Sequence, residues 1–235
     1  MGIPLSPEAI AAFHRYMVEL QAWNEHTNLT AIKSPDEIQT HHFLDSLALI
    51  PALASMHGIG IPSLLERSYR IADVGCGPGF PGLALKLAWP ALKLTAIEAT
   101  AKKLSFISTI VDALSVKDTV LIHARAEHIG LQPGERESYD LVVARALAPL
   151  PVLVEYLLPL ARLDGWVVAY KGAMAEQEAA AARQGILKLG GHDPQLMSIS
   201  VPCLDERRVL IFIHKVRKTP SRYPRQGGAA RKFPL

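Results

Sequence analysis

The chain has 235 residues, of which 49% are hydrophobic and 20% are charged, a balance that is ordinary for a globular protein. This length allows one sizeable domain with an extension. The two cysteines, Cys76 and Cys203, form no CxxC pair, which excludes a disulfide scaffold and a cysteine zinc site and favours the cytoplasm. The adjacent His41 and His42 would be a poor chelating pair on a helix, so we expect no metal.

The formal net charge of +3 is unevenly distributed. The last 21 residues, 215–235, contain seven Lys or Arg residues and no acid, whereas the other 214 carry 18 basic and 22 acidic side chains. Such a tail is either a solvated end or a segment that binds a phosphate-bearing partner. The most apolar stretch, Leu141–Leu160, is interrupted by Arg145, Glu155 and three prolines, and the chain start lacks a signal-peptide pattern, so we expect no membrane contact.

The first 67 residues are predicted to be a helical extension. Ser6 is a candidate N-cap, Pro7 suits the first helical position, and apolar residues follow at helical spacing. A second helix is predicted over residues 34–51, ending near its C-terminal proline, and residues 55–63 are expected to be a loop.

From residue 68 the pattern changes to short apolar runs rich in β-branched residues, separated by segments of helical period. This alternation predicts an α/β domain with a doubly wound parallel sheet over residues 68–215, before the basic tail of residues 216–235. Only four residues separate the last two runs, so these must form an antiparallel hairpin. The seven runs are Tyr69–Val74, Leu92–Glu98, Thr119–Ala124, Tyr139–Ala144, Gly165–Lys171, Pro194–Pro202 and Arg207–Lys215, and the helical segments are Pro81–Ala88, Ala101–Leu114, Leu150–Leu160 and Ala175–Leu189.

The stretch IADVGCGPGFPG (Ile71–Gly82) follows the first predicted strand, where such sheets bind ligands. Its glycines are either a tight corner or a loop that lets the backbone approach a ligand. Asp73 would repel a pyrophosphate at the next helix N-terminus and favours a cationic ligand, and the GFPG spacing departs from dinucleotide folds. A nicotinamide-dependent oxidoreductase is therefore disfavoured. Glu98 ends the second strand, where a carboxylate can accept both ribose hydroxyls.

Several motifs together resemble the glucose-inhibited division protein B family, the guanine-N7 methyltransferases of bacterial small-subunit ribosomal RNA. The resemblance implies a class I S-adenosylmethionine methyltransferase domain with a mostly parallel seven-stranded sheet. One departure is Gln226, because the family usually has Lys after the arginine at Arg225. The motifs are WNEHTNLT (Trp23–Thr30), HFLDSL (His42–Leu47), DVGCGPGFPGL (Asp73–Leu83), EATAKKLSFI (Glu98–Ile107), ARAE (Ala124–Glu127), YDLVVARA (Tyr139–Ala146), YKG (Tyr170–Gly172) and YPRQGGAARKFPL (Tyr223–Leu235).

The resemblance also implies a site for S-adenosyl-L-methionine. Asp73 would lie near the cofactor ammonium, Glu98 would hold the ribose, and Glu127 would border the adenine, although Glu127 could instead be a solvated loop carboxylate. Arg145 is the best candidate for positioning the methyl acceptor, and its alternative is a structural ion pair. The implied cofactor residues are Asp73, Gly75, Gly77, Gly79, Phe80, Glu98, Ala126, Glu127 and Arg145.

The implied partner is small-subunit ribosomal RNA or the 30S particle, modified by a cytoplasmic monomer without a metal. Guanine N7 carries no proton, so no catalytic base is assigned. Trp23, Asn28, His42 and Asp45 are interpreted as structural in preference to contacting substrate. The alternatives are a methyltransferase of this fold acting on another RNA, a protein or a small molecule, and a non-enzymatic RNA-binding protein. Expected RNA-binding residues are Lys171, which could instead be solvated, and Arg222, Arg225, Arg231 and Lys232.

Overall fold

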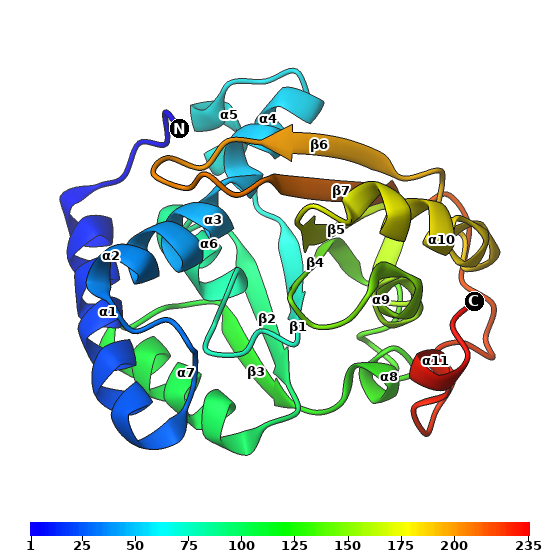
Figure 1. Cartoon of the computed structure of the whole chain (residues 1–235), viewed down its shortest axis with the longest axis horizontal. Coiled ribbons are helices and arrows are strands. Elements are labelled where there is room, and N and C mark those ends of the chain that lie inside the picture. The colour runs from blue at the N-terminus through cyan, green and yellow to red at the C-terminus, as the bar shows by residue number, and fades with distance from the viewer.

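The computed structural model describes residues 1–235 and contains one seven-stranded sheet with the order β3-β2-β1-β4-β5-β7-β6 (Figure 1). The first five strands are parallel to one another, whereas β7 runs antiparallel to both β5 and β6. The predicted α/β class with a C-terminal antiparallel hairpin is therefore confirmed. The strands are β1 (Arg70–Val74), β2 (Lys93–Glu98), β3 (Thr119–His123), β4 (Tyr139–Arg145), β5 (Ala161–Lys171), β6 (Gln195–Ile199) and β7 (Arg208–His214).

Helices cover both faces of the sheet because its strands are apolar on both sides. Ile71 of β1 belongs to a core shared with α1, α6 and α7, and the next residue, Ala72, belongs to a second core shared with α9 and α10. The helices are α1 (Pro7–Thr27), α2 (Pro35–Glu37), the π-helix η1 (Ile38–Leu44), α3 (Asp45–Leu47), α4 (Leu49–Met56), α5 (Ile61–Leu65), α6 (Gly82–Ala88), α7 (Ala101–Ala113), α8 (Ala126–Ile129), α9 (Leu150–Leu157), α10 (Ala175–Lys188) and α11 (Ala229–Lys232). None of them is long and apolar enough to cross a membrane.

The N-terminal helices confirm one boundary prediction and correct another. Ser6 caps α1 by accepting a hydrogen bond from the Ala9 N–H at 3.2 Å, as predicted. The second predicted helix does not end near Pro51, and residues 55–63 are not all loop, because α5 begins at Ile61. Pro51 lies in the first turn of α4, where a missing N–H leaves no intrahelical bond unmade, so helix continues beyond it.

The basic tail is docked against the domain and is not a solvated end. Tyr223 and Ala230 are buried, and α11 packs beside α9 at the lower right of the molecule (Figure 1). Arg136 fastens the segment by donating hydrogen bonds to the carbonyls of Thr219, at 2.8 Å, and Tyr223, at 2.7 Å. The tail therefore brings its charges to a defined place on the surface.

Candidate cofactor and acceptor site

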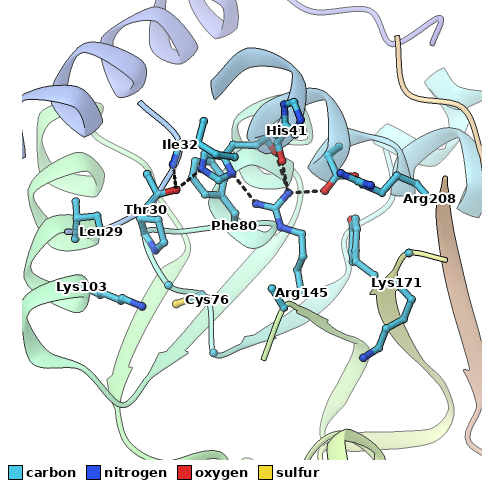
Figure 2. A pocket seen from close by; sticks show the side chains of 18 of the residues that line it. Leu29, Thr30, Ile32, His41, Cys76, Phe80, Lys103, Arg145, Lys171 and Arg208 are labelled. Atoms are coloured by element: carbon cyan, nitrogen blue, oxygen red, sulfur yellow. Dashed lines mark hydrogen bonds and ion pairs between the residues drawn. The ribbon is translucent and has the colours of Figure 1, made fainter. Parts of the chain in front are cut away.

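A cleft of about 520 Å³ opens at the carboxyl edge of the sheet (Figure 2). Its floor is the loop between β1 and α6, and its other walls come from the N-terminal helices and the ends of β4, β5 and β7. The cleft brings together several residues predicted from the sequence. Those that line it are Gly75, Gly77, Phe80, Arg145, Lys171, His42 and Asp45.

The glycine loop is shaped by backbone conformations that favour glycine. Gly75 and Gly77 have φ values of +70° and +56°, and no atom lies within 4 Å of a Cβ added at Gly77. The Gly77 N–H donates to Glu98 Oε2 at 2.9 Å, while the Thr100 N–H donates to Glu98 Oε1 at 2.8 Å. Glu98 thus ties the loop to the end of β2. Gly79 does not line the cleft, and a Cβ added there would clash with the Tyr16 hydroxyl oxygen.

Asp73 is fully buried at the N-terminus of α6. Its Oδ2 accepts the Gly82 N–H at 2.6 Å, and its Oδ1 has no hydrogen-bond partner. Burial raises the pKa of Asp73 to about 7, although the Gly82 N–H and the nearby Arg145 act in the opposite direction. A carboxylate therefore occupies the helix end where a dinucleotide fold would hold pyrophosphate. Asp73 is 0% exposed and does not line the cleft, so its negative charge would favour a cationic ligand there without exposing the carboxylate to it.

Phe80 is the centre of an aromatic and cationic stack. The His42 ring lies parallel to it at 4.5 Å, Tyr16 stacks at 5.3 Å, and the Arg145 guanidinium carbon is 5.3 Å from the ring centroid. Tyr16 also donates a hydrogen bond to the Pro78 carbonyl. Residues from α1 and η1 therefore hold the glycine loop from above.

Arg145 forms the structural ion pair that was its alternative role, and it also lines the cleft. Its Nη1 lies 2.7 Å from Asp45 Oδ2 and donates to the His41 carbonyl at 3.0 Å. Asp45 Oδ1 is 3.2 Å from Arg208 Nε, so one buried carboxylate is shared by two guanidinium groups. Asp45 thus ties β4 and β7 to the N-terminal helices, and the cluster keeps an excess of positive charge at the cleft.

A second hollow of about 390 Å³ lies beside the cleft and contains Ala126 and Glu127. Leu147 also lines it, and this side chain lies over Gly75, with Cδ1 at 2.6 Å from an added Cβ. The tail closes another side, because Gly227, Gly228 and Arg231 line the hollow. The departure at Gln226 has a structural partner, since its Nε2 donates to the Glu127 carbonyl at 2.7 Å.

Two of the expected RNA-binding residues are engaged within the chain. Lys171 Nζ lies 2.7 Å from Glu178 Oε2 and is turned away from the cleft (Figure 2). Arg225 Nη2 lies 2.6 Å from Oε2 of the buried Glu155. An RNA phosphate would have to compete with these ion pairs. The other three, Arg222, Arg231 and Lys232, are exposed.

Sequence reasoning did not single out Tyr16, Thr30, Lys103 or Arg208 as site residues. Thr30 and Arg208 line the cleft, and Lys103 extends from α7 toward the glycine loop (Figure 2). Thr30 lies inside the motif WNEHTNLT and Lys103 inside EATAKKLSFI, so both positions could have been identified as candidates from the motifs. Nothing in the local sequence distinguishes Tyr16 from a core residue.

No group of three or more His, Cys, Asp and Glu side chains is arranged to hold a metal ion. Solved structures share the fold of the chain. TYW2 from M. jannaschii in complex with AdoMet matches with a TM-score of 0.52 and 14% identity, over 64% of this chain and 69% of that one. MtNAS in complex with MTA and tNA matches with a TM-score of 0.55 and 14% identity, over 87% and 71%. The chain therefore shares the α/β fold of these solved structures, with its glycine loop at the switch point of the sheet.

Comparison of sequences identifies the family. The family model described as GidB, rRNA small subunit methyltransferase G, matches residues 9–209. The curated protein named ribosomal RNA small subunit methyltransferase G from Roseiflexus castenholzii is 42% identical over 234 residues, which cover 100% of this chain and 95% of that protein. The protein of the same name from Acetivibrio thermocellus is 37% identical over 100% and 92%. The chain belongs to the rRNA small subunit methyltransferase G family.

Proposed function

We propose that the protein transfers a methyl group from S-adenosyl-L-methionine to N7 of a guanine in bacterial small-subunit (16S) ribosomal RNA. The observation that carries the proposal is the full-length similarity to relatives of that name, together with a cleft that contains the glycine loop. The proposed substrate is small-subunit rRNA, free or within the 30S particle, and the proposed form is a monomer in the cytoplasm.

The proposed cofactor site spans the cleft and the second hollow. Gly77 leaves open space for close approach of the methionine portion, whereas Leu147 lies over Gly75 and would have to move for a ligand to approach there. The unpartnered oxygen of Asp73 favours the ammonium of the cofactor. Glu98 already accepts two backbone N–H groups, and each carboxylate oxygen has a further lone pair for a ribose hydroxyl. Ala126 and Glu127 would contact the adenine from the second hollow. Phe80 and Arg145 would border the reacting groups.

The proposed reaction requires no general acid or base from the protein. S-adenosylmethionine supplies a methyl group that is already activated on a sulfonium. Guanine N7 offers a lone pair and no proton, so the chain must align the two reactants and exclude water, and alignment can contribute about 7–11 kcal/mol at best. His42 is not free to act as a base, because both ring nitrogens have hydrogen-bond partners. The rigid stack around Phe80 suits an aligning role.

Basic groups near both openings support an RNA substrate. Arg208 and Lys103 line the cleft, and Arg231 lines the second hollow. Exposed Arg222 and Lys232 extend this positive charge along the tail. Such contacts to phosphate would make binding strongly dependent on salt.

A labelled-methyl assay tests the proposal. Purified protein with labelled S-adenosylmethionine is expected to label 30S particles from a strain that lacks the endogenous methyltransferase, and nucleoside mass spectrometry is expected to find 7-methylguanosine. Free 16S rRNA and transfer RNA, assayed in parallel, distinguish the assembled particle from other acceptors. An Arg183→Ala variant, altered at an exposed ion pair away from the cleft, is the matched control. Failure to label small-subunit rRNA in either form would contradict the proposal.

A further inference from the structure

The backbone of Thr30 is fixed at the wall of the cleft by the side chain of Asn24. Asn24 is buried, its Nδ2 donates to the Thr30 carbonyl at 2.9 Å, and its Oδ1 accepts the Thr30 N–H at 2.9 Å. Asn28, with φ of +48°, turns the chain between them at the end of α1. The WNEHTNLT segment therefore holds one hydroxyl group in a defined position (Figure 2).

Both acceptor positions of the Thr30 hydroxyl are occupied. The Ile32 N–H donates to Oγ1 at 3.1 Å, and His42 Nε2 lies 2.9 Å from the same oxygen. The direction of the second bond follows from Arg145, whose Nη2 is 3.3 Å from His42 Nδ1. A guanidinium can only donate, so Nδ1 accepts and the ring proton is on Nε2, which donates to Thr30.

The His42 ring is neutral, as this arrangement requires. Burial, and then the positive charge of Arg145, lower the pKa of His42 to about 3. The hydroxyl oxygen of Thr30 has two lone pairs, and both now have donors. Neither of its hydrogen bonds within the chain uses the hydroxyl proton. This proton is therefore available to a ligand in the cleft, toward which Thr30 acts as a donor.

A group that can only donate distinguishes guanine from adenine. On the edge that carries N7, guanine presents the acceptor O6, whereas adenine presents an amino group that donates. We infer that Thr30 Oγ1 donates to O6 of the target guanine and is a specificity-determining residue, an inference that rests on the proposed function. This contact selects guanine, orients its N7 edge into the cleft and leaves the N7 lone pair free for the methyl group.

The proposed contact is tested by changing both of its partners, O6 of the target guanine and the side chain of Thr30. The target guanine in reconstituted small subunits is replaced by 2,6-diaminopurine, which retains N7 and the 2-amino group and carries an amino group in place of O6. We expect the wild-type enzyme to methylate guanine at least about tenfold faster than diaminopurine. With diaminopurine the neutral hydrogen bond from the Thr30 hydroxyl is lost, and the hydroxyl faces the 6-amino group, which is also a donor. Thr30→Val should lose about tenfold on guanine and little on diaminopurine, so that the preference nearly disappears. Thr30→Ser should retain it.

The ratio of the two rates separates recognition from structural damage. A structural defect in Thr30→Val would lower both rates together, and the affinity for S-adenosylhomocysteine, measured by calorimetry, should be unchanged. Equal wild-type rates on the two bases would overturn the inference without any variant. A Thr30→Val enzyme that keeps the wild-type preference would also overturn it. A wild-type enzyme that methylates no rRNA would overturn the proposed function and this inference with it. The reaction on guanine alone separates that outcome from failure of the inference by itself, in which guanine is still methylated.

Discussion

Two buried carboxylates, Asp45 and Glu155, pair with arginines that come from distant parts of the sequence. The side chain of Asp45 is 5% exposed and lies between Arg145 and Arg208. The side chain of Glu155 is 0% exposed and pairs with Arg225 alone, through Nε and Nη2. The first cluster joins the N-terminal helices to the sheet at the cleft, and the second fastens the tail to α9.

The difference lies in the balance of charge. At Glu155 one carboxylate neutralises one guanidinium, which leaves a structural pair with little attraction for an RNA phosphate. At Asp45 one carboxylate serves two guanidinium groups, so positive charge remains where the cleft opens. A basic residue is therefore a better candidate for RNA binding where its counterion is shared than where the pair is complete.

Breaking the pair at Glu155 should have the largest effect. Glu155→Ala removes the partner of Arg225 and the acceptor of its backbone N–H, and we expect the free energy of unfolding to fall by about 3–5 kcal/mol. Urea denaturation measures this loss. The matched control is Asp193→Ala, which breaks the exposed pair with Arg183 and should cost less than about 1 kcal/mol. Equal losses in the two variants would contradict a structural role for the Glu155 pair.

Asp73 provides a third case, a buried carboxylate without an arginine partner at hydrogen-bond distance. Since its pKa is raised to about 7, it is ionised above that pH and protonated below it. We expect wild-type affinity for S-adenosylhomocysteine to weaken as pH falls from 8 to 6, because the ligand ammonium prefers the ionised form. Asp73→Asn should bind about ten- to a hundredfold more weakly at pH 8, with a flatter pH profile in calorimetry. An unchanged profile in the variant would assign the titration to another group.

His42 makes the Asp45 cluster sensitive to acid, because its ring hydrogen-bonds to Arg145. Its pKa in the folded state is lowered to about 3, so the unfolded chain takes up a proton below about pH 6.5 that the folded chain does not. The stabilising contribution is fully present above pH 6.5 and is lost as pH falls. Relative to His42→Gln, wild-type free energy of unfolding should decrease by roughly 1 kcal/mol per pH unit below 6.5. Parallel pH curves in denaturation would contradict this expectation.

The smallest expected effect is the loss of RNA affinity when Arg208 is replaced. Arg208→Ala should weaken binding to the small subunit about threefold and reduce the slope of log affinity against log salt by about 0.7–0.9, the range for one phosphate contact on single-stranded to double-stranded nucleic acid. Filter binding at several salt concentrations measures both quantities. Cofactor affinity serves as the control and should not change. If Arg225→Ala reduced the salt slope as much as Arg208→Ala, the contrast between shared and complete ion pairs would be wrong.

Most of the fold could be predicted because its signals are local. The predicted helix Ala175–Leu189 ends one residue beyond the observed Ala175–Lys188, since apolar periodicity needs no tertiary information. The hairpin was predicted from the short link before β7, although β6 ends at Ile199 and the link is longer than expected. Pro51 misled the prediction because a proline ends a helix only when the helix began well before it.

The site was less predictable because side-chain roles depend on distant partners. The glycine loop and Glu98 could be placed from the ends of successive strands. The engagement of Arg225 could not, since Glu155 is 70 residues away in the sequence. Thr30 was missed for a related reason: its hydroxyl becomes a donor only because His42 and Ile32 supply hydrogens to it.

The docked tail has a consequence for the order in which the protein becomes functional. Gly227, Gly228 and Arg231 line the second hollow, and Gln226 supports its wall at Glu127. During translation these residues are synthesised after every strand of the sheet, because the last strand, β7, ends at His214. The sheet can therefore form earlier, and the hollow gains its last wall only when the segment from Gln226 to Arg231 has been made and has docked.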